Sequence, residues 1–423
     1  MTNRSRRARS WLTIALPTLV GLAIFMLVVE LGSMVYVSAR QNRYVPAKKL
    51  LTQTHNAFIA QLTKGGSGCR YLDTLFPHPY LAFVHHGRPP CGIPHINNIG
   101  LFGDNFPHEK RQDRFVVLLT GGSVAAQLGQ IGGPGAPKFL EEALNRKYRS
   151  PNGKPFLVLN GADAAWKQPQ QLILYLLYAE IVDAIVTLDG FNEHYTLESS
   201  LRFEYPSNNF TVVNPKANHS FGKVVLLWAA GRIAGFLSTN PVTQRSHASY
   251  LFVSGLEDLI QRASYQMVGP KVALGTMFAL PEAWDKEKRK RNAVAQYRKY
   301  VHALNATAKR YSLPVAHFIQ PVPAIRKTLT DQERAVIGDL GYGEIYQWMT
   351  DQMLELNGQG LSVHSLLGLL ENERGTIYAD SIHFETGEEG DSRGYRIMAQ
   401  SMASTLAKSW KLPELPGSAG HRR

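Results

Sequence analysis

The chain has 423 residues, of which 44% are hydrophobic and 19% are charged. This composition is that of an ordinary globular protein and excludes a largely disordered chain. The formal net charge of +13 would suit nucleic-acid binding, but the basic residues gather in short runs at 4–9, 286–291 and 422–423. No nucleic-acid-binding motif accompanies these runs, so we expect no nucleic-acid partner. We assign the first run to membrane topology and the second to a solvated helix face, with an acidic polymer or anionic lipid as the alternative.

The N-terminus carries a targeting signal. A basic tail, residues 1–10, precedes an apolar segment, residues 11–37, in which Glu30 is the only charged residue. The segment exceeds the roughly 20 residues that a helix needs to cross a bilayer. Positive charge before it predicts a cytoplasmic N-terminus and a periplasmic or extracellular remainder. The alternative is a cleaved secretory signal ending near Val37-Ser38-Ala39, but the length favours a retained anchor.

A juxtamembrane stalk, residues 38–68, ends in the flexible run Gly65-Gly66-Ser67-Gly68. Cys69 and Cys91, the two cysteines of the chain, follow it. Outside the cytoplasm they can form a disulfide, which would constrain the unfolded chain by roughly 3 kcal/mol. Their spacing does not match a zinc site, and we expect no metal.

Residues 69–412 are predicted to form one α/β domain, followed by a flexible tail, 413–423. From Phe115 onward, short β-branched apolar runs alternate with longer helical stretches, which predicts a parallel sheet covered by helices. The expected strands are 115–120, 156–160, 184–188, 271–278 and 314–319. The expected helices are 136–148, 169–182, 282–311 and 395–406.

Two insertions interrupt this alternation. The first, 196–245, contains an apolar patch, 224–237, which is too short for a confident second span. It predicts a cap helix or a surface that faces the membrane or the substrate. The second, 328–371, is expected to be helical and to shape substrate specificity.

The strand 115–120 ends in Gly121-Gly122-Ser123. The glycines permit a tight turn, and a serine that then opens a helix presents its hydroxyl above the sheet, as nucleophilic acyl chemistry requires. The alternative is an ordinary helix-capping serine. Ser123 is thus a candidate nucleophile whose interpretation depends on the rest of the chain.

Three further motifs support that candidate. Gly161 follows an apolar run and can offer its backbone N–H to an oxyanion, and Asn192, after another apolar run, can offer its side-chain amide. Near the C-terminus, Asp380 precedes His383 by three positions and can orient the imidazole, leaving Nε2 free to accept a proton from Ser123. Each motif has a structural alternative, namely a turn or ordinary surface chemistry.

In the order Ser123, Gly161, Asn192, Asp380 and His383, these motifs resemble the blocks of the SGNH (GDSL-like) hydrolase superfamily, over residues 115 to about 406. The resemblance implies a three-layer α/β/α sandwich with a flavodoxin-like parallel five-stranded sheet. It makes Ser123 the nucleophile, His383 the base and Asp380 its orienting acid. It makes Ser123, Gly161 and Asn192 the oxyanion hole. The chain departs from the family's pattern in having Gly122 for the usual Asp and Glu193 for the Asp that usually follows the block Asn.

The resulting hypothesis is an extracytoplasmic serine esterase that hydrolyses an O-acyl ester of a glycan or lipid through an acyl-enzyme, without a cofactor. One alternative is an O-acyltransferase that modifies an extracellular glycan. Another is a non-catalytic carbohydrate-binding or assembly protein on the same fold.

Overall fold

The computed structural model of the chain describes residues 4–41, 43–53, 74–87, 93, 95–130, 135–207, 221–267, 277–387 and 390–416. Cys69 and Cys91 lie outside the described residues, so the disulfide between them stays a prediction.

The centre of the molecule is a parallel sheet of five strands in the order β4-β3-β5-β6-β7. Taken in chain order, this is the 2-1-3-4-5 arrangement of doubly wound α/β proteins. The strands are β3 (Phe115–Gly121), β4 (Phe156–Ala162), β5 (Ala184–Asp189), β6 (Val315–Ile319) and β7 (Val363–Ser365).

The inner strands have the composition of strands buried on both faces. Every residue of β3 and of β5 is buried, and both are runs of apolar and β-branched residues rather than alternating ones. Helices therefore cover the sheet. In one group, three helices pack against one another: α4 (Ser123–Gly129), α5 (Phe139–Lys147) and α15 (Arg393–Trp410). In a second group, α12 (Lys286–Arg310) packs against α6 (Gln170–Tyr178) and α14 (Gly343–Leu354).

The capping residues explain where the long helices begin. Asp285 accepts a hydrogen bond from the backbone N–H of Lys288 (2.7 Å), so α12 starts at Lys286 and not at residue 282. Ser392 caps α15 in the same way through the N–H of Tyr395 (3.4 Å), and Lys411 in the left-handed conformation ends that helix.

The fifth strand differs from expectation. The predicted strand 271–278 falls mostly outside the described residues, and its two described residues, Met277 and Phe278, are not in a strand. The edge strand is instead β7, which pairs with β6 and belongs to the segment 328–371 that we expected to be helical. That segment also forms the helices α13 (Asp331–Val336) and α14 and the short 3₁₀ helix η4 (Glu355–Gln359). The second insertion is therefore partly an integral piece of the sheet.

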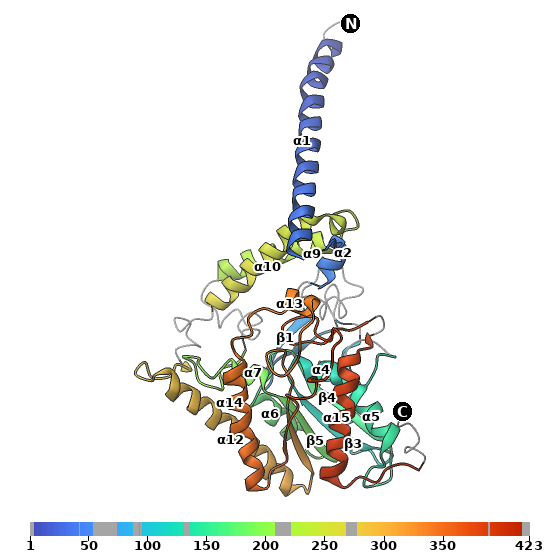
Figure 1. Cartoon of the computed structure of the whole chain (residues 1–423), viewed down its shortest axis with the longest axis vertical. Coiled ribbons are helices and arrows are strands. Elements are labelled where there is room, and N and C mark those ends of the chain that lie inside the picture. Colours follow the sequence, from blue (N-terminus) through green and yellow to red (C-terminus); the bar gives the residue numbers. More distant parts are fainter. Residues whose placement is uncertain are drawn as a thin grey trace.

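At its N-terminus the chain forms one long helix, α1 (Arg4–Arg40), which projects away from the rest of the molecule (Figure 1). Residues 16–40 of it are long and apolar enough to cross a membrane, a test that a signal sequence also passes. Its side chains are largely exposed, and Val37, near its end, is buried against Val45 and Leu50. Shorter helices gather at its base: α2 (Ala47–Gln53), α9 (Phe221–Thr239) and α10 (His247–Met267) (Figure 1). Between this layer and the sheet lies a small antiparallel hairpin of β1 (Leu75–His78) and β2 (Ala82–His85).

Candidate active site

Ser123, His383 and Asp380 form a continuous chain of hydrogen bonds. Ser123 Oγ lies 2.7 Å from His383 Nε2, although the two residues are 260 positions apart. The other ring nitrogen, Nδ1, lies 2.8 Å from Asp380 Oδ2. Because an ionised carboxylate only accepts, Nδ1 carries the proton in this arrangement and Nε2 is the acceptor for the serine hydroxyl. This is the geometry that a general base needs to activate a serine.

The loop that carries the acid and the base is held in shape by its own backbone. Asp380 Oδ1 accepts hydrogen bonds from the N–H groups of Ile382 (2.8 Å) and His383 (2.7 Å). The loop is closed where the N–H of Ala379 donates to the carbonyl of His383 (2.8 Å). Burial acts to raise the pKa of Asp380, but the charge of His383 and these hydrogen bonds outweigh it and lower the pKa to about 2. The acid therefore stays ionised at any ordinary working pH.

Glu333, at the start of α13, anchors the base of the same loop. Its Oε1 accepts hydrogen bonds from the N–H groups of Ile377 (3.0 Å) and Tyr378 (3.1 Å), and Oε2 lies 3.2 Å from the buried Lys327 ammonium. Burial alone would raise the pKa of Glu333, but these backbone donors and Lys327 lower it. The sequence analysis missed this residue, although Thr330-x-x-Glu333 is a capping box that the sequence displays.

Ser123 and Asn192 flank the point at which the strand order of the sheet reverses. Ser123 follows β3 and is the first residue of α4, and Asn192 follows β5 in the short helix α7 (Phe191–His194). In doubly wound sheets, ligands bind outside the carboxyl ends of the strands at this switch point. The fold thus places the candidate nucleophile where a substrate is expected.

Asn192 packs directly against the turn that presents Ser123. Its Nδ2 donates to the carbonyl of Trp166 (2.7 Å), which uses one of the two amide hydrogens. A Cβ atom at Gly122 would lie only 2.2 Å from Asn192 Nδ2. The Gly-Gly-Ser sequence therefore has a steric reason, since any side chain at position 122 would displace Asn192.

Gly161, unlike Asn192, lies within a strand of the sheet. Gly161 is buried inside β4, paired with Thr120, and a Cβ there would meet Leu174 and Leu118. No hydrogen bond within the described part of the chain joins Gly161 to Ser123 or Asn192, so its role in an oxyanion hole stays a prediction.

The segment that follows β4, residues 163–166, contacts Asn192 directly. Ala165 adopts the left-handed conformation (φ 62°), and the carbonyl of Trp166, the next residue, is the one that accepts from Asn192. The N–H groups on either side are used, because that of Ala164 donates to Asp163 Oδ1 (2.7 Å) and that of Trp166 to Asp163 O (3.2 Å). The N–H of Ala165 has no hydrogen-bond acceptor among the described residues, which makes it a second candidate donor.

A buried His–Asp pair supports this segment. His85 Nε2 lies 3.0 Å from Asp163 Oδ1, and His85 Nδ1 lies 2.8 Å from the hydroxyl of Thr74. His85 is buried at the end of β2. The pair is 78 positions apart, and no local pattern marks it.

Beneath α7, buried charges fix the turn that carries Asn192. Glu193 Oε2 accepts from the N–H of Gly190 (2.8 Å), whose positive φ (118°) suits glycine. Burial raises the pKa of Glu193 and that of Asp189. The nearby charge of Glu193 raises the pKa of Asp189 further. Burial lowers the pKa of Lys167 to about 8 against the opposing charge of Glu193. Glu193 thus bonds the backbone before Asn192 and holds the turn that carries it.

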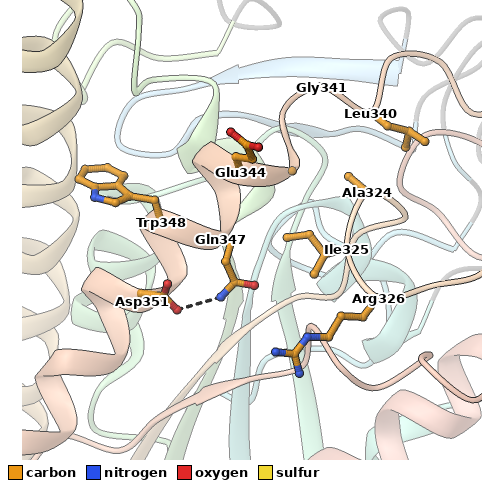
Figure 2. Close-up of a pocket in the computed structure, with 10 residues that line it drawn as sticks. Ala324, Ile325, Arg326, Leu340, Gly341, Glu344, Gln347, Trp348 and Asp351 are labelled. Atoms are coloured by element: carbon orange, nitrogen blue, oxygen red, sulfur yellow. Dashed lines mark hydrogen bonds between the residues drawn. The ribbon is translucent and has the colours of Figure 1, made fainter.

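A pocket of about 720 Å³ opens beside α7. Its lining includes His194 and Tyr195, two and three residues after Asn192, the aromatic rings of Tyr342 and Trp348, and charged side chains such as Lys290. A neighbouring pocket of about 690 Å³ shares Trp348 with it and continues along α14. Figure 2 shows Glu344, Trp348 and Asp351 projecting from this helix, with Ala324 to Arg326 on the opposite side and Gln347 bonded to Asp351 (2.8 Å). The expected specificity segment, 328–371, supplies most of this lining.

No family model and no curated protein matches the chain. Within the described ranges, no group of three or more His, Cys, Asp or Glu side chains is arranged to hold a metal ion. The functional interpretation therefore depends on the geometry of the site itself.

Proposed function

We propose that the protein is a serine esterase that cleaves an O-acyl ester through an acyl-enzyme. The observation that carries the proposal is the hydrogen-bond chain from Ser123 through His383 to Asp380, assembled from distant segments at the carboxyl end of the sheet. The structural alternative for Ser123 is a side chain that caps helix α4. No side-chain cap hydrogen bond is formed at the start of α4, so the structure does not favour that alternative.

The reaction follows from this geometry. Ser123 Oγ attacks the ester carbonyl while His383 Nε2 takes the hydroxyl proton, and Asp380 stabilises the imidazolium. The developing oxyanion lies near the N–H of Ser123 at the start of α4 and the second amide hydrogen of Asn192, with the N–H of Gly161 or Ala165 as a further donor. His383 returns the proton to the leaving alcohol, and water then releases the acid by the same steps in reverse.

The finer assignment to the SGNH hydrolase superfamily, with a three-layer α/β/α sandwich and a flavodoxin-like sheet, is part of the proposal. It is supported by the strand order β4-β3-β5-β6-β7 and by the two separate groups of covering helices. It is supported also by Ser123 and Asn192 standing after adjacent strands, since the family's pattern requires these residues to meet.

The proposal includes a location. Helix α1 serves as a membrane anchor with its N-terminus in the cytoplasm, and the sheet domain lies in the periplasm or outside the cell. The supports are the apolar stretch at residues 16–40 and the basic residues before it. Protease accessibility tests this topology: the domain should be digested in right-side-out vesicles, and digestion only after inversion would contradict it.

The activity is tested with the full-length protein in detergent and p-nitrophenyl acetate as a small ester. Wild type is expected to turn over, and Ser123→Ala to fall to background with its circular dichroism unchanged. Equal activity in both proteins would remove Ser123 from the mechanism.

A second function, transfer of the acyl group to a glycan, is favoured by the pocket beside α7. Aromatic faces and carboxylates are side chains that sugars contact, and Tyr195, Tyr342 and Glu344 line this pocket, whose lining begins at His194, two residues after Asn192. Incubation with an acyl donor and candidate glycans separates the two reactions. Acylated glycan would establish transfer, and free acid alone would establish hydrolysis.

A further inference from the structure

Helices α9 and α10 turn apolar side chains outward. Four residues of α9, one residue of the connecting loop and two residues of α10 are large, hydrophobic and between 47% and 79% exposed. They are Val225, Leu226, Ile233, Phe236, Val242, Phe252 and Leu259. Monomeric proteins in water rarely present an apolar surface of this extent.

The exposed residues of α9 share one face of the helix. The spacing from Leu226 to Ile233 and on to Phe236 is seven and then three positions, which returns to the same side of an α-helix. The opposite side packs inward, where the buried Ala234 contacts a cluster with Leu51 of α2 and Val253 of α10. The pair of helices thus packs inward through one apolar cluster and presents a second apolar face away from the protein.

The pair is attached to α1 at a defined height. The carboxylate of Glu30 accepts hydrogen bonds from the hydroxyl of Ser246 (2.5 Å) and from the N–H groups of His247 (2.7 Å) and Ala248 (3.2 Å). It therefore caps the N-terminus of α10, as an anionic group at a helix N-terminus does. Figure 1 shows α9 and α10 crossing the base of α1 at this level.

That height coincides with the expected membrane boundary. A span of about 20 residues that begins at Trp11 ends at Glu30, and the apolar stretch continues to residue 40, so the outer boundary falls between Glu30 and Arg40. Glu30 is ten residues from Arg40, the last residue of α1, or about 15 Å at 1.5 Å per residue. Exposed basic residues follow in the chain, which suits anionic headgroups: Arg40, Arg43, Lys48 and Lys49.

We infer that α9 and α10 form a hairpin that lies in the outer interface of the membrane crossed by α1, with its apolar face among the lipid acyl chains. The occupant of that face is the lipid bilayer, because the face is continuous with the exposed surface of α1. The inference rests on the membrane anchoring proposed above.

Helix α2, which packs beside the hairpin at the base of α1, also lies close to the catalytic loop. Gln332 Nε2 of α13 donates to Glu385 Oε1 (2.7 Å), two residues after His383. Burial raises the pKa of Glu385, and the positive charge of Lys49 in α2 opposes that rise, so α2 lies near the loop. The end of the domain that carries Ser123 therefore faces the membrane-proximal layer.

The test is photo-crosslinking of the full-length protein in vesicles of phosphatidylethanolamine and phosphatidylglycerol. p-Benzoylphenylalanine replaces Phe236 or Phe252 on the hairpin, Phe25 on α1 as the anchor control, and Tyr311 on the far side of the domain as the aqueous control. All four side chains are exposed in the protein. We expect a lipid mass adduct at positions 25, 236 and 252 at comparable yield, and none at 311.

The alternatives are distinguishable. An adduct at position 25 with none at 236 and 252 would overturn the hairpin inference and leave the anchor intact. No adduct at position 25 would overturn both the anchor and the inference. Crosslinks at 236 and 252 to a second copy of the chain, seen as a doubled mass, would replace the bilayer by a protein partner.

Discussion

The sheet domain and the hairpin of α9 and α10 contain the same kinds of apolar residues. In the sheet domain these residues face the interior, and in the hairpin many of them face outward. Phe318, in β6, is completely buried, whereas Phe236, in α9, is 60% exposed. Around the sheet the apolar residues form one continuous core, and around α9 and α10 they form only small clusters and otherwise face outward. Composition alone cannot distinguish the two regions, because the solvent that each face meets decides which direction is stable.

The comparison also concerns chemistry. In the sheet domain, polar groups that meet at the site are each held by a second contact: Asp380 by its own loop, Asn192 by Trp166, and the loop by Glu333. In the hairpin, polar contacts tie α10 to Glu30 of α1. Under the proposals above, the first region serves a reaction and the second attachment.

The largest effect is expected at the base and its acid. His383→Ala removes the proton acceptor and Asp380→Asn removes the acceptor for Nδ1–H, so ester hydrolysis should fall between about a hundredfold and ten-thousandfold. The rate is measured with p-nitrophenyl acetate, and thermal unfolding of each variant serves as the control for folding. A fully active His383→Ala protein would show that the hydrogen-bond chain has no catalytic role.

Asn192→Ala comes next, because it removes one oxyanion donor and leaves the triad in place. Turnover should drop by about a hundred- to a thousandfold. The drop should appear in kcat rather than in KM, since the bond to the oxyanion strengthens only in the transition state. An unchanged kcat would separate Asn192 from the reaction.

Gly122→Ala tests whether Asn192 must be held against the serine turn. The new methyl group would overlap Asn192 Nδ2, so activity should fall toward that of Asn192→Ala and stability should fall by about 1–3 kcal/mol. Gly358→Ala is the matched control, because a Cβ there has no atom within 4 Å. Activity loss in both variants would mean that the effect is not local to the site.

The contrast between the two regions is tested by stability, where no effect on catalysis is expected from the exposed site. Phe318→Ala in the sheet core should cost about 3–5 kcal/mol of unfolding free energy. Phe236→Ala in detergent should change it by less than about 0.5 kcal/mol, because the side chain lies outside the protein core. Denaturant unfolding monitored by circular dichroism measures both. A large loss in Phe236→Ala would mean that α9 packs against protein rather than lipid.

Much of the sheet was predictable because its strands are strong apolar runs. The predicted strands at 115–120, 156–160, 184–188 and 314–319 are confirmed as β3 to β6, each within a residue or two at its ends. The edge strand β7 was not predicted, because Val363-His364-Ser365 is short, has polar residues at two of its three positions and pairs on one side only. A strand of this kind is specified by its neighbour and not by its own sequence.

The candidate site was likewise predictable only in part. Ser123 and Asn192 were predicted from motifs at the ends of apolar runs, and Asp380 and His383 from their spacing of three positions. The structure joins Ser123, His383 and Asp380 by hydrogen bonds and places Asn192 against Gly122. Gly161 was chosen because it is a glycine near a strand end, but β4 extends through it to Ala162. The positive φ of Ala165 and the His85–Asp163 pair depend on tertiary contacts, so no local signal marked them.

The most direct test of the central claim is labelling of the full-length protein with a fluorophosphonate, followed by mass spectrometry of the labelled peptide. The account predicts one adduct, on Ser123, that is abolished in Ser123→Ala and strongly slowed in His383→Ala, because the probe reacts only with an activated serine. Absence of labelling in folded wild type, or a label on another residue that persists in Ser123→Ala, would contradict the assignment of Ser123 as the nucleophile.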